Sequence, residues 1–379
     1  MEGSLIGAIN GGDVDQVRYL LSQGVSLWPD REIFEGDPPC WKVDNHLKPS
    51  AWVQAEPSVL FGETIPLFLA ARSGNLEVIT AILDAGFPAD FACLRYSGGR
   101  LQNALDYAAN VEVVRLFLSK GVRFASDPGL DSALYQARTR QEVVDLFALG
   151  HPSCWKDDFV PYDPLHSMLE EHLWEAAEAY CECLEPDDRE SILYEKFMMF
   201  LGAECDFEVI TFLHRLGADP TGMPPACYIP ADVAPEPGLP LHYLGWFDDR
   251  NYDELVKIEV VKTFNFLIAH GVDINKRDSK GGTPLFAASQ GNSIVTDLLI
   301  QHGAEVNATI AGWSPLMHAS TYGSVSCVRS LVMAGADLSI VDDEGNSAWS
   351  VANEGLAEAM AKGDEEAARN YQEILQILS

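Results

Sequence analysis

The sequence predicts an all-α fold, a solenoid of about nine or ten helix-turn-helix repeats with a capping repeat at each end and long inserted loops. Three observations support this prediction. Residues 281–307 and 312–338 are near-copies of one unit. Pro284 and Pro315 stand 31 residues apart, and Gly303 and Gly335 stand 32 apart, a period typical of stacked repeats. Glycines also close apolar segments earlier in the chain, so the pattern extends well beyond this pair.

Each part of the unit has a mechanical reason. Thr283 or Ser314 can cap a first helix that begins with proline, which lacks the amide proton that a first turn would leave unpaired. A glycine ends this short helix, and a second apolar helix runs to the next glycine, which suits a left-handed C-terminal cap. One such pair cannot bury its own apolar face, whereas stacked copies can.

Both copies carry a recognisable pattern: Thr-Pro-Leu at 283–285 with Gly-Ala-Glu at 303–305, and Ser-Pro-Leu-Met-His-Ala at 314–319 with Gly-Ala-Asp at 335–337. These segments resemble ankyrin repeats, and the resemblance covers roughly 300 of the 379 residues. It implies an ankyrin-repeat solenoid that binds other proteins through its hairpin tips and helical face and performs no chemistry.

In the N-terminal half, residues 1–26 hold a helix pair without the Thr-Pro-Leu turn, as expected of an N-terminal capping repeat. Residues 27–63 break the pattern with tryptophans and prolines, which predicts an inserted loop. Residues 64–150 return to degenerate repeats, in two of which alanine replaces the proline.

Residues 151–219 predict acidic, strongly diverged repeats, because Gly150 and Gly217 are 67 residues apart, close to two periods. We expect the fifth repeat from Asp163 to about Asp188 and the sixth from about Ser191. A Pro-rich insertion follows at 220–240, then regular repeats at 241–346 and a C-terminal capping repeat at 347–379.

The charge of the chain is strongly negative. The sequence has 57 acidic and 25 basic residues, a net charge of −32, and residues 151–260 alone hold 24 acidic and 6 basic residues. Such a surface repels nucleic acid and anionic lipid and attracts basic proteins. The regional excess favours a docking surface for a basic partner, whereas the alternative is a solvated face that keeps an extended molecule in solution.

Candidate partner-binding residues are the acidic clusters of this region and the aromatic residues beside them. Buried aromatic side chains are common anchors of protein interfaces, although the same side chains could attach a loop to its own scaffold. The candidates are Trp155, Asp157, Asp158, Glu170, Glu171, Trp246, Phe247, Asp248, Asp249, Asp253 and Glu254.

Other classes of function find little support in the sequence. The eight cysteines are scattered without a CxxC pair, and neither an HExxH nor a GxSxG motif occurs, so we expect no enzyme, no cofactor, no metal and no catalytic residue. No apolar run of about 18 residues occurs, and residues 1–4 lead straight into repeat-like sequence. We therefore expect a cytoplasmic protein without a secretory signal.

The leading hypothesis is a non-enzymatic binding protein, monomeric on its own, that captures and inhibits a basic partner protein through its acidic surface. By analogy it resembles immunity proteins that neutralise a cognate toxin such as a nuclease. It is expected to bind neither nucleic acid directly nor a membrane. Two alternatives remain: a passive scaffold or adaptor that bridges two proteins, and a nucleic-acid mimic that occupies a DNA- or RNA-binding cleft.

Overall fold

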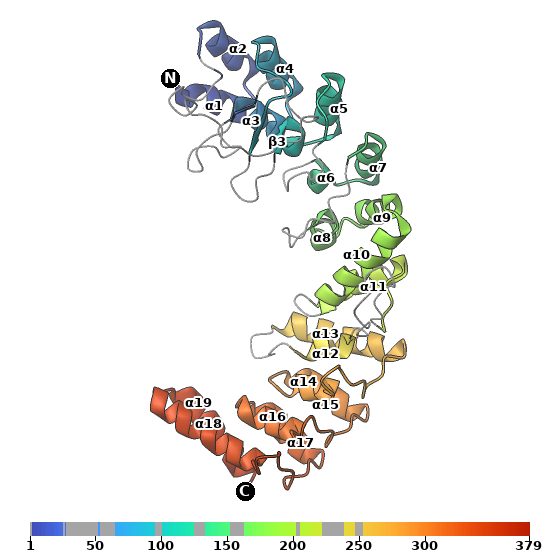
Figure 1. The fold of residues 1–379 in the computed structure, drawn as a ribbon, viewed down its shortest axis with the longest axis vertical. Coiled ribbons are helices and arrows are strands. Elements are labelled where there is room, and N and C mark those ends of the chain that lie inside the picture. Colours follow the sequence, from blue (N-terminus) through green and yellow to red (C-terminus); the bar gives the residue numbers. More distant parts are fainter. Residues whose placement is uncertain are drawn as a thin grey trace. The chain divides into compact units, whose positions relative to one another are not determined.

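Pairs of antiparallel helices recur along the chain (Figure 1). The computed structural model describes residues 2–25, 27, 52–53, 65–94, 101–124, 133–151, 163–201, 205–221, 239–246 and 253–379. The helices pack into two units, Met1–Leu184 and Glu185–Ser379. The described residues of each unit contain five helix pairs, which confirms the fold predicted from the sequence.

In the N-terminal unit, the first helices of the pairs pack on one another as one layer and the second helices as another. The first layer consists of α1 (Glu2–Asn10), α3 (Pro66–Ser73), the 3-10 helix η4 (Ala104–Tyr107), α6 (Ala133–Gln136) and α8 (Pro164–Glu170). The second layer consists of α2 (Val14–Ser22), α4 (Leu76–Asp84), α5 (Val111–Ser119), α7 (Arg140–Ala148) and α9 (Trp174–Cys183).

A small sheet accompanies this unit and was not expected from the sequence. Strand β1 (Trp52–Val53) pairs in parallel with β2 (Ala92–Leu94), which pairs antiparallel with β3 (Leu101–Asn103). Strands of two or three residues are too short to show an alternating pattern. Main-chain pairing therefore joins one point of the predicted 27–63 insertion to the segment between α4 and η4.

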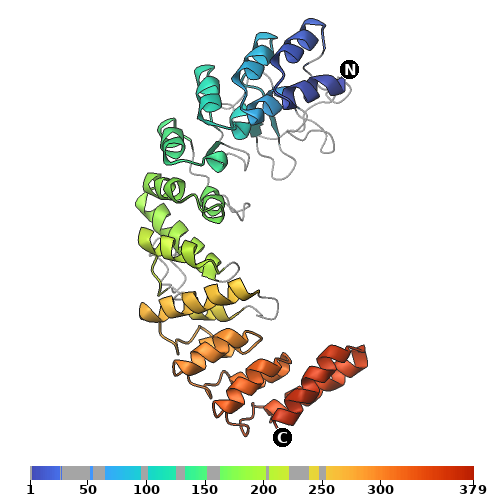
Figure 2. The same cartoon turned by 180° about the vertical axis from the view of Figure 1, so that it is seen from behind.

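From α12 and α11 onward, the C-terminal unit has the same two layers, which Figure 2 shows from behind. Its first helices are α10 (Pro186–Met199), α12 (Pro240–Gly245), α14 (Pro284–Ala288), α16 (Pro315–Thr321) and α18 (Ala348–Lys362). Its second helices are α11 (Phe207–Leu216), α13 (Glu254–Ala269), α15 (Ser293–Gln301), α17 (Val325–Met333) and α19 (Glu365–Ile377). Helix α10 begins at Pro186, earlier than the expected start near Ser191, because this proline rather than Ser191 occupies the first helical turn.

Side-chain caps start the regular repeats as the sequence predicts. The hydroxyl oxygens of Thr283 and Ser314 accept hydrogen bonds from the amides of Phe286 and Met317, each at 3.2 Å. The glycines that close the second helices have positive φ, which costs glycine little and other residues more. These glycines are Gly24, Gly86, Gly121, Gly150, Gly217, Gly271, Gly303 and Gly335.

Asparagines tie successive pairs together. Oδ1 of Asn292 caps α15 by accepting from the Val295 amide at 3.0 Å, and its Nδ2 donates to the Leu244 carbonyl of the preceding pair at 3.2 Å. Asn75 does the same between α4 and the Gly12 carbonyl, at 3.3 Å. One amide thus satisfies a helix start and a neighbouring helix end, both of which would otherwise leave unpaired main-chain groups.

Candidate functional site

Two of the first helices of the C-terminal unit, α12 and α16, carry aromatic side chains at matching positions. Tyr243 follows the first proline of α12 by three residues, and His318 follows that of α16 by three. Helix α14, which carries Phe286, packs against both, and Gly245 lets α12 approach Ala288 of α14 closely. Tyr243, Phe286, His318 and Tyr322 are called the aromatic row below. Tyr243 and Tyr322 are exposed, so side chains of this row are available to a partner.

His318 is held at the centre of this row. Its ring stacks on that of Phe286, with 4.2 Å between centroids, and meets the edge of Tyr322 at 4.9 Å. The Ser289 hydroxyl donates to the Phe286 carbonyl at 2.7 Å, so its oxygen is placed to accept from His318 Nδ1 at 3.1 Å. The imidazole is therefore fixed in orientation as well as in position.

Burial also fixes the charge of this imidazole. Removal of water lowers the pKa of His318 to about 4, against a smaller opposing contribution from the hydrogen bond to the Phe286 main chain. His318 is consequently neutral near pH 7. The row therefore presents flat, uncharged rings, an arrangement that suits stacking and apolar contact rather than ion pairing.

Helix α13 is longer than the second helices that follow it. Aligned on the closing glycines Gly271, Gly303 and Gly335, helices α15 and α17 begin ten residues before their glycine, whereas α13 begins seventeen before. The additional residues, 254–260, are called the α13 extension. They contain Leu255 and Ile258, whose exposed fractions are 72% and 50%.

Trp246 lies at the same end of this helix pair. It is the C-cap residue of α12, which is joined to the start of α13, and it is 59% exposed. Its ring centroid is 6.2 Å from that of Tyr243, a member of the aromatic row. Of the sequence candidates, Trp246, Asp253 and Glu254 therefore belong to one helix pair, α12 and α13.

Two of these acidic candidates already have structural contacts. The Asp253 carboxylate caps α13 by accepting from the amides of Leu255 and Val256 at 3.0 and 2.9 Å. Glu254 pairs with Lys257 at 2.8 Å on the surface. An acidic residue at the start of a helix is stabilising in itself, so their local role is the formation of α13.

Glu170 and Glu171 belong to the other unit. Glu170 is exposed and lies 3.4 Å from Nε2 of the buried His166. Glu171 pairs with Arg138 of the preceding helix pair at 3.0 Å, and Arg140 similarly reaches Glu182 of α9. Part of the acidity at 170–182 is therefore balanced by arginines about one repeat earlier in the chain.

The remaining candidates lie outside the described residues. These are Trp155, Asp157, Asp158, Phe247, Asp248 and Asp249. They remain predictions from the sequence alone.

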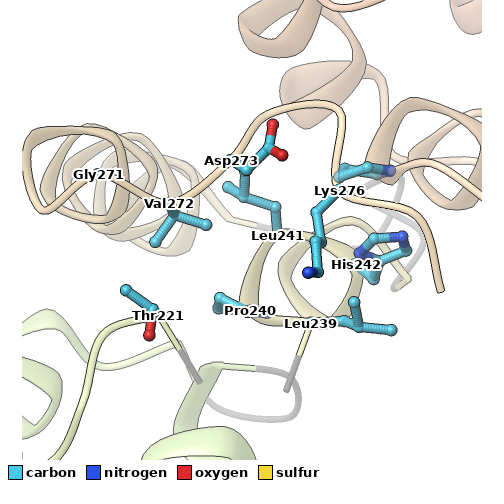
Figure 3. Close-up of a pocket in the computed structure, with 10 residues that line it drawn as sticks. Thr221, Leu239, Pro240, Leu241, His242, Gly271, Val272, Asp273 and Lys276 are labelled. Atoms are coloured by element: carbon cyan, nitrogen blue, oxygen red, sulfur yellow. The ribbon is translucent and has the colours of Figure 1, made fainter. Parts of the chain in front are cut away.

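A pocket of about 150 Å³ lies beside the first turn of α12 (Figure 3). Leu239, Pro240 and His242 line one side, and Lys276 reaches toward them from the turn after α13. His242 Nε2 donates to the Gly282 carbonyl at 3.1 Å, and burial lowers the pKa of His242. The volume is below the roughly 300–1,000 Å³ of small-molecule sites, so the pocket does not suggest a cofactor.

The part of the chain that the structure describes holds neither a cluster of metal-binding side chains nor a helix suited to span a membrane. No group of three or more His, Cys, Asp or Glu side chains is placed to hold a metal ion there. None of the helices in these ranges combines the length and apolar character that crossing a membrane requires.

The regular repeats of the C-terminal unit are similar in sequence to known proteins. A family model described as ankyrin repeats, in three copies, matches residues 256–342. The B-cell lymphoma 3 protein homolog of Mus musculus is 38% identical over 97 residues, which are 23% of this chain and 22% of that protein. The ankyrin repeat protein nuc-2 of Neurospora crassa is 35% identical over 88 residues, 22% of this chain and 8% of that protein. The chain therefore spans less than a quarter of either relative.

Proposed function

This chain is an ankyrin-repeat protein, and from that premise we propose that it captures a basic partner protein and inhibits it by covering the surface with which that partner acts. Ankyrin repeats indicate a protein that interacts with other proteins. The observation that carries the proposal is the aromatic row, which displays Tyr243 and Tyr322 on the first helices of the regular repeats. Catalysis forms no part of the proposed role.

The aromatic row has the character of an interface centre. Tyrosine and tryptophan dominate the binding energy of many interfaces because they bury much area with few rotatable bonds. Ring stacking holds Phe286 and His318 in place before a partner arrives, so little side-chain freedom is lost on binding. The row is therefore suited to provide affinity.

The charge of the chain supports a basic partner. A net charge of −32 steers positively charged proteins toward this molecule and repels acidic ones. A toxin such as a nuclease fits this description, because the face that binds a phosphate backbone is rich in lysine and arginine. Capture through that face would prevent access of nucleic acid, which is the mode of action proposed here for an immunity protein.

A pull-down followed by a matched variant pair tests this function. The tagged chain is incubated with native lysate, washed at low and high salt, and the retained protein is identified by mass spectrometry and purified. We expect one basic protein, retained stoichiometrically, whose affinity falls at least tenfold in the double variant Tyr243→Ala, Tyr322→Ala, because two exposed anchors are lost. The affinity should also fall steeply with salt.

The control variant is Met333→Ala, which alters a side chain that is 82% exposed on the second-helix layer. It should leave the affinity unchanged. Equal weakening by both variants, or capture of several proteins irrespective of salt, would count against an inhibitor that acts through the aromatic row.

One observation supports the alternative of a scaffold that bridges two proteins: the described helices form two units of five helix pairs each. A scaffold would hold two proteins at once, one on each unit. Simultaneous retention of two partners, only one of which is released by the double variant, is the outcome that favours it over the inhibitor.

A further inference from the structure

We propose that the α13 extension, together with Trp246, is a docking surface for a basic amphipathic helix of the partner protein. This inference rests on the proposed function and adds the kind of segment that the partner presents. The α13 extension is not part of the regular repeat, because α15 and α17 both begin at positions that correspond to residue 261 of α13 and contain no turns equivalent to 254–260.

One face of the α13 extension packs against the unit, and another face is exposed to solvent. Val260 is fully buried, and Val256 one turn earlier is partly buried, so this stripe packs against the unit. Leu255 and Ile258 are three residues apart and therefore share a different stripe, which faces solvent. A soluble surface helix ordinarily places polar residues on such a stripe.

The exposed apolar stripe has the dimensions of a helix contact. Seven residues of α-helix rise about 10 Å, so the α13 extension offers two turns to a partner. Side chains three and four apart form the ridges that interlock when helices pack. Trp246, at the same end of the pair, adds a large ring with the amphipathic character of an interface anchor.

Charge selects the occupant of this surface. The described residues 253–260 contain three acidic residues and one basic residue, Lys257, which pairs with Glu254 at 2.8 Å. A second copy of a chain that carries a net charge of −32 would be repelled, as would an anionic membrane. A helix with apolar residues on one face and lysine or arginine along its flanks complements both the stripe and its acidic border.

The test uses a model peptide, since the partner is unidentified. The probe is an 18-residue fluorescein-labelled peptide of leucine and lysine arranged as an amphipathic helix, and its control is a scrambled peptide of equal composition and charge. Fluorescence anisotropy with the full chain should show at least tenfold tighter binding of the amphipathic peptide. In the double variant Leu255→Gln, Ile258→Gln this preference should disappear, because glutamine keeps the helix and removes the apolar stripe.

Met333→Gln provides the matched control on another exposed apolar residue of the same unit, and it should leave the preference intact. Circular dichroism of each variant checks that the fold is retained, as expected for exposed positions. Equal binding of both peptides, or a preference that survives the double variant, would overturn the docking surface. Self-association that the double variant abolishes would assign the surface to a second copy and overturn the proposed occupant.

The two proposals can fail separately. If the double variant Leu255→Gln, Ile258→Gln captures the native basic partner as tightly as the unmodified chain does, the docking surface is wrong and the capture function stands. If the unmodified chain retains no basic protein from lysate, the capture function is wrong whatever the peptides show.

Discussion

Substituting Gly355 with alanine is expected to lower the free energy of unfolding by about 1 to 3 kcal/mol, the range that overpacking typically costs. A Cβ atom at Gly355 in α18 would lie 2.4 Å from Cε1 of Tyr371 in α19. The ring cannot retreat easily, since its hydroxyl donates to the Thr321 carbonyl at 2.6 Å and the ring also lies close to Gly323. Urea unfolding followed by circular dichroism measures the loss.

The sign of the effect makes this test decisive. Alanine inside a helix is ordinarily more stable than glycine by about 0.5 to 1 kcal/mol. Gly7→Ala in α1 is the control, because a Cβ there would meet no atom within 4 Å and should give that gain. A Gly355→Ala variant as stable as the unmodified chain would show that α19 does not pack on α18 through Tyr371.

Substituting His318 with glutamine is expected to remove a pH dependence worth about 3 kcal/mol of unfolding free energy. Burial lowers the pKa of His318 from 6.5 to about 4, so between these values the unfolded chain binds a proton that the folded chain does not. The contribution of His318 is complete above the unfolded-state pKa and is lost as the pH falls toward 4. The difference in stability between the unmodified chain and His318→Gln should therefore shrink from pH 7 to pH 4.

Two measurements check this prediction. Urea unfolding at several pH values gives the difference between the two proteins, which cancels the titration of the many carboxylates that both share. An NMR titration of the imidazole gives the pKa itself. Parallel stability curves, or an imidazole that titrates near 6.5, would contradict the half-buried stack of Phe286 and His318.

The fold was predictable because its signals are local and repeated. Thr283 before Pro284, and glycines at a fixed spacing, act within a few residues of themselves, and the structure bears them out. The strands β1 to β3 were not predictable, since β1 pairs with a segment 40 residues later in the sequence and is only two residues long. A pairing between such short and distant segments produces no periodic pattern of hydrophobic residues in the sequence.

The candidate site was predictable only in part. Trp246 was identified from its sequence neighbourhood and is exposed, whereas the aromatic row was missed because its members are scattered over three repeats. Asp253 could have been recognised as a helix cap, since an acidic residue directly before an apolar run is a start signal. The Glu171 contact with Arg138 could have been anticipated from their separation of 33 residues, one repeat period.

The way α13 is lengthened bears on how such a chain can diversify. All the additional residues precede the ordinary start of the second helix, while the spacing from the end of the helix to Gly271 equals that at Gly303 and Gly335. Because the helix is lengthened at its N-terminal end, the turn at Gly271 is unchanged. The next repeat therefore keeps its position in the stack. Selection can therefore lengthen, shorten or rewrite residues 254–260 to follow a changing partner without reworking the stack behind them.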